Sequence, residues 1–124
     1  GIWLAGREDR MKGRFTGAGR QPLDQVLRAV DRTRPVILMD HQPFRLDDAA
    51  RHGVDLQVSG HTHHGQLWPL SFITRAVYPV SWGYRRIGGT HVYVSCGFGT
   101  WGPPVRVGNR PEIVLIEVAF NPQS

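Results

Sequence analysis

A short apolar run that ends in a glycine and two histidines constrains this chain more than any other feature. Residues 54–58 read as a β-strand that ends at Gly60, and His61 and His63 follow directly. On extended backbone, residues i and i+2 point to the same side, about 6.5–7 Å apart along the chain. Gly60 and Gly65 allow the backbone to bend here without a β-carbon in the way. The pattern predicts two imidazoles on one rim, able to bind one metal ion or two neighbouring ions.

A third histidine follows a second apolar run. Residues 36–40 form a near-continuous apolar stretch, typical of a strand buried on both faces, and His41 comes next. Open α/β sheets place ligand sites beyond the carboxyl ends of their strands. Because His41 and His61 each end a strand of the same predicted unit, we expect them to converge. We therefore predict a metal-binding role for His41, His61 and His63.

The other three histidines have weaker claims to such a role. His64 is adjacent to His63 and should point away from it, so we expect it to support the ligands or face the substrate without binding metal. His52 follows a predicted surface helix and His91 lies in a predicted hairpin. For these two residues we expect a solvated or structural role.

Alternating helical and strand patterns predict an α/β unit, followed by mostly antiparallel β structure. Apolar residues spaced by three, four and seven predict a helix over residues 22–31, and Gly88-Gly89 predicts a tight hairpin turn. The remaining expected elements are strands at 2–5, 36–40, 54–58, 82–87, 90–95 and 112–120, a helix at 46–52, an exposed loop at 12–20, and a loop or broken helix at 68–81.

Composition favours one small domain with a real core and argues against several classes of protein. The 124 residues are 40% hydrophobic and include four Trp, and no run approaches the roughly 18–20 apolar residues that cross a bilayer. The single cysteine, Cys96, excludes an internal disulfide framework. The net charge of +5 comes from arginines spread along the chain, with Lys12 the only lysine. Because the basic residues form no dense run, we expect no nucleic-acid partner.

Residues 97–102 spell the pattern G-x-G-x-x-G after a predicted strand. In dinucleotide-binding proteins this pattern opens a helix whose N-terminus holds pyrophosphate. Pro103 and Pro104 follow at once and block such a helix. We therefore exclude the dinucleotide interpretation and expect a tight loop close to the metal rim.

Three segments, in the same order along the chain, resemble the calcineurin-like metallophosphoesterase superfamily. Residues 59–66 contain the motif Gly-His-x-His, residues 35–43 match a strand that ends in His-x-Pro, and residues 96–113 match a Gly/Pro-rich closing segment. They are most similar to a bacterial branch, often membrane-associated or exported, that usually has Gly at the position of His64. The resemblance alone implies a membrane-associated or exported parent protein, and we make no prediction of localisation from the sequence itself.

Earlier motifs of that superfamily, Asp-x-His, Gly-Asp-x-x-Asp and Gly-Asn-His, do not occur in the chain. The resemblance therefore implies that residues 1–124 are the C-terminal part of a single metallophosphoesterase domain, whose N-terminal part is absent. The implied fold is the C-terminal half of an α/β/β/α sandwich. One apolar sheet face would then need a cover, either by self-association or by the missing N-terminal half.

The resemblance implies a phosphoester hydrolase with a dinuclear metal centre. His41 and His61 would bind one divalent ion and His63 the other, while the bridging Asp, the Asn and a proton-donating His would come from the absent half. Such ligands suit Mn, Fe, Zn or Ni about equally, and the substrate would be a phosphate ester of undefined class. The alternative is a non-catalytic metal-binding or structural fragment, in which three histidines hold one zinc ion.

Overall fold

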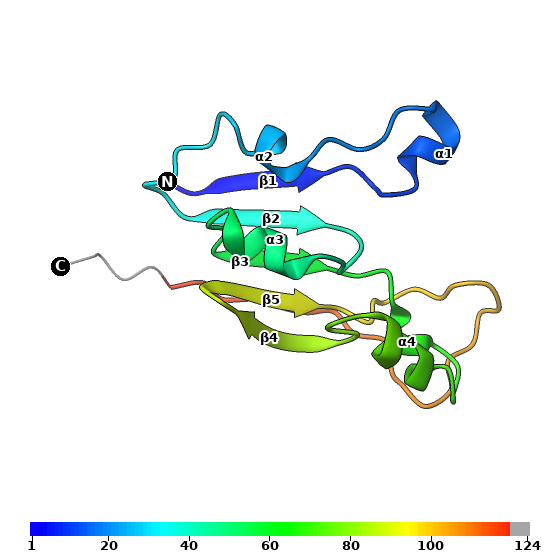
Figure 1. The fold of residues 1–124 in the computed structure, drawn as a ribbon. Coiled ribbons are helices and arrows are strands. Elements are labelled where there is room, and N and C mark those ends of the chain that lie inside the picture. Colours follow the sequence, from blue (N-terminus) through cyan, green and yellow to red (C-terminus); the bar gives the residue numbers. More distant parts are fainter. Residues whose placement is uncertain (120–124) are drawn as a thin grey trace.

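Five strands form one mixed sheet in the order β1-β2-β3-β5-β4, as Figure 1 shows. The computed structural model describes residues 1–119. The first three neighbouring pairs are parallel, and only β4 runs antiparallel, paired with β5. The strands are β1 (Trp3–Arg7), β2 (Val36–Asp40), β3 (Leu56–Ser59), β4 (Gly83–Ile87) and β5 (Thr90–Val94). The predicted α/β class is confirmed.

The hydrophobic core lies on one face of this sheet, where α2 (Leu23–Val26) and α3 (Leu46–Arg51) cover it. Alternate strand residues point to that face because the side-chain period of a strand is two. Two clusters of buried residues form there, one around β1 and β2 and one around β5. Their members are Ala5, Leu23, Leu27, Val36, Leu38, Ala49 and Val54 in the first, and Leu46, Val80, Val92 and Val94 in the second.

The opposite face of the sheet remains open at the β1–β2 side. Leu4 and Met39 belong to this face by alternation, and their exposed fractions are 62% and 44%. Near β4 and β5, residues 116–119 run past Tyr84 and Tyr93. The cover that the resemblance implies, by self-association or by an N-terminal half, stays a prediction.

The predicted helix over residues 22–31 is correct in its buried face but wrong in its length. Leu23 and Leu27 are 2% and 1% exposed, yet α2 ends at Val26 and tighter turns follow, with Val30 N–H donating to Leu27 C=O at 3.1 Å. A short helix depends on tertiary packing, and beyond Leu27 only Val30 packs against the core.

Two further helices occupy segments that were predicted as irregular. The short α1 (Lys12–Thr16) lies within the predicted exposed loop, and α4 (Ser71–Val77) lies within the predicted loop or broken helix. The helix at 46–52 is confirmed as α3. Within residues 1–119 no helix is long and apolar enough to cross a membrane.

The predicted final strand over residues 112–120 is wrong for residues 112–119, which have no strand structure, while Phe120 lies outside the described residues. A strand needs a partner ladder, and the backbone of this segment contributes one bond, from Glu112 N–H to Gly97 C=O at 3.1 Å. The second half of the chain is accordingly less β-rich than predicted. Its antiparallel structure is the β4–β5 hairpin, and Leu67 and Val107 add one isolated parallel bridge.

Candidate metal centre

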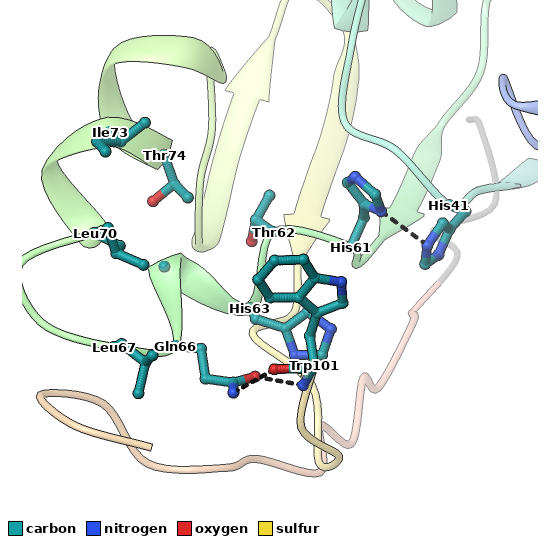
Figure 2. Close-up of a pocket in the computed structure, with 11 residues that line it drawn as sticks. His41, His61, Thr62, His63, Gln66, Leu67, Leu70, Ile73, Thr74 and Trp101 are labelled. Carbon is teal, nitrogen blue, oxygen red and sulfur yellow. Dashed lines mark hydrogen bonds between the residues drawn. The ribbon is translucent and has the colours of Figure 1, made fainter. Parts of the chain in front are cut away.

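His41 and His61 lie at the carboxyl ends of two adjacent parallel strands, β2 and β3. The pairing continues one step past the strands, because Gly60 N–H donates to His41 C=O at 3.0 Å. His61 then adopts a left-handed backbone conformation with φ of 68°. Figure 2 shows the two rings edge to face, joined by a hydrogen bond between their nitrogens. His41 and His61 therefore converge as predicted, because the backbone pairing and the bend at His61 bring their side chains together.

The two imidazoles approach closely enough to share an ion. His41 Nε2 and His61 Nδ1 are 3.1 Å apart, and the rings are 79° from parallel. Nitrogens that each bond one ion at about 2.1 Å lie roughly 3.0–3.4 Å apart when the angle at the ion is about 90–110°. The structure records this 3.1 Å separation as a hydrogen bond, and two imidazole nitrogens at such a distance have the chemistry to supply two of the ligands of a divalent transition-metal ion. Burial, and then the positive charge that His41 can carry, lower the pKa of His61, which favours the neutral, ligand-competent ring.

His63 lines the same cavity but does not join the first pair. It begins the short helical turn η1 (His63–Gly65), and both His63 and Trp101 line the cavity of Figure 2. Burial, followed by the charge of Arg106, lowers the pKa of His63. Within the part of the chain that the structure describes, no three His, Cys, Asp or Glu side chains gather closely enough to hold one ion. The described residues thus do not form the three-histidine zinc site of the alternative.

Residues 97–104 form a loop beside the histidines, as predicted, and no helix begins there. A β-carbon on Gly97 would lie 3.9 Å from His63 Cε1, and Trp101 borders the cavity that the histidines line. Since the glycine pattern does not lead into a helix, the dinucleotide interpretation fails on structural grounds as well.

Two polar residues of the closing segment brace the histidine loop, and the sequence analysis did not identify either. Arg106 Nη2 donates to the C=O groups of Cys96 and Gly97 at 2.9 and 3.0 Å, and lies 3.4 Å from His63 Nδ1. Asn109 Nδ2 donates to the C=O groups of His63 and His64 at 2.9 and 3.0 Å. Their only sequence signal is that they are polar residues in a Gly/Pro-rich segment, which does not indicate a contact with residues more than forty positions away.

His64 points away from the cavity, against residues next to β4. Its Nδ1 lies 3.1 Å from Ser81 Oγ, its ring centroid lies 5.2 Å from that of Trp82, and the residue is 8% exposed. Its backbone is left-handed, with φ of 46°. Glycine adopts this conformation without strain, which accounts physically for the Gly that the resembling branch usually has here.

The remaining two histidines lie away from the cavity. His52 Nδ1 lies 2.8 Å from Asp48 C=O, near the end of α3. His91 is exposed on β5, with Nδ1 3.0 Å from Tyr84 Oη. Both positions agree with a structural or solvated role.

Curated proteins similar to this chain share one class of name. A metallophosphoesterase of Helicobacter pylori, described as uncharacterized, is 37% identical over 98 residues, covering 77% of this chain and 26% of that protein. A transmembrane protein with metallophosphoesterase domain of Danio rerio is 38% identical over 121 residues, covering 93% and 27%. An uncharacterized metallophosphoesterase of Campylobacter jejuni is 33% identical over 123 residues, covering 94% and 31%.

The chain belongs to the metallophosphoesterase superfamily, a family of hydrolases that use divalent metal ions. It spans only 26–31% of the length of these three relatives. No family model matches the chain, and no solved structure matches it significantly.

Proposed function

We propose that the full-length protein hydrolyses phosphate esters at a dinuclear metal centre to which this chain contributes histidine ligands. His41 and His61 would hold one divalent ion, and His63 would contribute to the second. The observation that supports this most directly is the 3.1 Å approach of His41 Nε2 to His61 Nδ1, at the ends of adjacent parallel strands in a member of the metallophosphoesterases.

The ligand set of this proposal is completed outside the chain. Two histidines leave coordination positions open on the first ion, and His63 alone cannot hold the second. We propose that carboxylate and amide ligands, together with the proton donor to the leaving group, come from a part of the full-length protein that precedes this sequence. Imidazole with carboxylate suits Mn, Fe, Zn or Ni, so the metal has to be determined by experiment.

The residues of this chain have positioning roles in the proposed reaction. When bound, the two ions supply positive charge to the phosphate and lower the pKa of the attacking water. His41 and His61 present ring nitrogens from a fixed strand edge, since Gly60 N–H holds the His41 carbonyl. Asn109 holds the carbonyls of His63 and His64, which fixes the loop that carries the second ligand. Held geometry of this kind lowers the entropic cost of reaching the transition state.

Hydrolysis of bis(4-nitrophenyl) phosphate by the full-length protein with Mn²⁺ or Zn²⁺ tests the proposal. We expect His61→Ala to reduce kcat/KM by about a hundredfold or more, because one ion loses a ligand. Metal content measured by mass spectrometry should fall in parallel. The matched control is His91→Ala, which removes an exposed histidine of β5. Activity of His61→Ala within threefold of the parent would contradict the proposed ligand role.

The chain by itself should be a poor enzyme. Without the bridging carboxylate and the proton donor we expect its turnover to be about a thousandfold slower than that of the full-length protein, or slower still. The same aryl phosphodiester and the same metals serve for both proteins. If the metal-loaded chain came within tenfold of the full-length protein, these histidines would suffice or chains would pair to rebuild the site.

A further inference from the structure

The cavity at the histidines has two chemically different walls. Its volume is about 440 Å³, and one wall carries the three histidines of the candidate metal centre. Figure 2 shows Leu67, Leu70 and Ile73 on the other side of the cavity, from the residues after η1 and from α4, with Trp101 of the closing loop between the two sides. The apolar residues that line the cavity are Leu67, Leu70, Ile73 and Trp101. Among the described residues, no Asp, Glu, Lys or Arg side chain lines this cavity.

The apolar wall is held in place against the histidine loop. A β-carbon on Gly65 would lie 2.3 Å from Ser71 N and 2.4 Å from Leu70 C, so the start of α4 packs directly on the loop that carries His63. On the other side, the buried Gln66 hydrogen-bonds the backbone of Trp101. The distance between the two walls is therefore set by contacts within this chain.

The same wall leaves a large apolar area exposed to water. The helix α4 buries none of its residues, and Leu70, Ile73 and Trp101 are 38%, 58% and 71% exposed. The free energy of the system falls when an apolar group covers exposed side chains of this size. Besides the histidines, the polar side chains that line the cavity are Thr62, Gln66 and Thr74. Each of them already hydrogen-bonds a backbone group of this chain, so a nucleotide or sugar would find few free hydrogen-bonding side chains here.

We propose that the substrate is an amphiphilic phosphoester, with its phosphate at the histidine wall and an alkyl chain against Leu70, Ile73 and Trp101. The inference rests on the proposed phosphoesterase function and adds a substrate class to it. An alkyl chain matches the apolar wall in chemistry, and the continuity of that wall with the histidines places it within reach of the ester.

A chain-length series tests this inference in the full-length protein. The probes are 4-nitrophenyl alkyl phosphates with methyl, butyl and octyl groups, used with Mn²⁺ below the concentrations at which they form micelles. Burial of one methylene increases binding by up to about fourfold, so we expect kcat/KM to rise at least tenfold from methyl to butyl. The leaving group is the same throughout, so the trend reports the alkyl group.

Two variants on α4 separate the apolar wall from general surface hydrophobicity. Ile73→Gln places an amide in the wall, and we expect it to lower the ratio of octyl to methyl kcat/KM at least fivefold. Val77→Gln is the matched control, because Val77 is 52% exposed on the same helix but does not line the cavity. The control should keep the parental ratio. Equal ratios in Ile73→Gln and the parent would overturn the inference.

A binding measurement keeps this inference separate from the proposed function. Alkylphosphonates of the same lengths cannot be turned over, and calorimetry on the metal-loaded protein measures their affinity. A protein that hydrolyses none of the esters would refute the proposed function, while an affinity that still rises with chain length would support the alkyl groove. No rise in either series would overturn it. Hydrolysis of long-chain esters only in phosphatidylcholine vesicles, without a trend among monomeric esters, would also overturn it and assign α4 to membrane contact.

Discussion

Gln66 and Trp101 are joined by two reciprocal hydrogen bonds although they lie 35 positions apart in the sequence. Gln66 Nε2 donates to Trp101 C=O at 2.7 Å, and Trp101 N–H donates to Gln66 Oε1 at 2.5 Å. Gln66 is 3% exposed, whereas the Trp101 side chain is 71% exposed. A buried amide thus holds an exposed indole at the rim of the cavity, and it links the histidine loop to the closing segment.

Replacing that amide should release the closing loop. In Gln66→Leu the backbone groups of Trp101 lose their partners, and we expect unfolding free energy to fall by about 1–3 kcal/mol. Trp101 should also become more mobile. Urea unfolding and tryptophan fluorescence anisotropy measure the two effects, with the exposed Gln25→Leu as the control. An unchanged anisotropy in Gln66→Leu would show that other contacts hold the loop.

Gly65 is a position where both conformation and space require glycine. Its φ is 76°, and an added β-carbon would lie 2.3 Å from Ser71 N, a backbone atom that cannot move aside independently. We expect Gly65→Ala to destabilise the protein by more than about 2 kcal/mol, or to prevent folding. Gly17→Ala is the matched control, since its φ is 72° but no atom lies within 4 Å, so that it reports conformational strain alone. Equal losses in the two variants, measured by chemical denaturation, would contradict a packing role for Gly65.

Asn109 acts as a donor to two carbonyl groups. Replacing its amide with a carboxylate tests this role. In Asn109→Asp a carboxylate would face the carbonyls of His63 and His64 in place of an N–H donor. We expect a loss of about 2–3 kcal/mol in unfolding free energy, because acceptors then oppose one another. Asn109→Ala removes the same two bonds, and also the bond that Arg106 Nη1 donates to Asn109 Oδ1 at 3.1 Å, but it adds no charge and should cost less. An aspartate variant as stable as the alanine variant in urea would argue against the bracing role.

Stability should fall at mildly acidic pH, with a contribution from His64. Burial, followed by the charge of Arg75, lowers the pKa of His64 in the folded protein. As pH falls below about 6.5, the unfolded chain therefore binds a proton before the folded one does. The stability contributed by the neutral ring is full above that pH and is lost as pH falls toward the folded pKa. His64→Gln should reduce the loss, as measured by urea unfolding between pH 8 and pH 5, with the exposed His91→Gln as the matched control. If His64→Gln lost as much stability between pH 8 and pH 5 as the parent protein, the predicted contribution of His64 would be wrong.

The strand ends of the candidate site could be predicted from sequence because their signals are local. The apolar run at 36–40 and the glycine at 60 mark where β2 and β3 end, and the structure has β2 at Val36–Asp40, as predicted. The convergence of His41 and His61 then follows from the parallel pairing of the two strands. Similarly, Gly88-Gly89 marked the β4–β5 hairpin, since a tight turn needs residues that tolerate positive φ.

Other elements could not be predicted because they depend on neighbours that are distant in sequence. Residues 112–119 have the composition of a strand, but where they run past Tyr84 and Tyr93 they form no ladder with β4 or β5. The segment 22–31 has helical periodicity, yet its helix ends at Val26 because little of the following turn packs on the core. Local pattern sets a preference, and the availability of a packing partner decides whether it is realised.

The sequence by itself identified the residues for which a metal role is predicted: His41, His61 and His63, each following a strand or a glycine bend. Only the tertiary structure decided that His63 does not join the pair of His41 and His61, that His64 faces Ser81, and that Arg106 and Asn109 brace the histidine loop. The physical reason is that side-chain hydrogen bonds have a reach of about 3 Å, so they form only after the folded backbone has brought distant loops together.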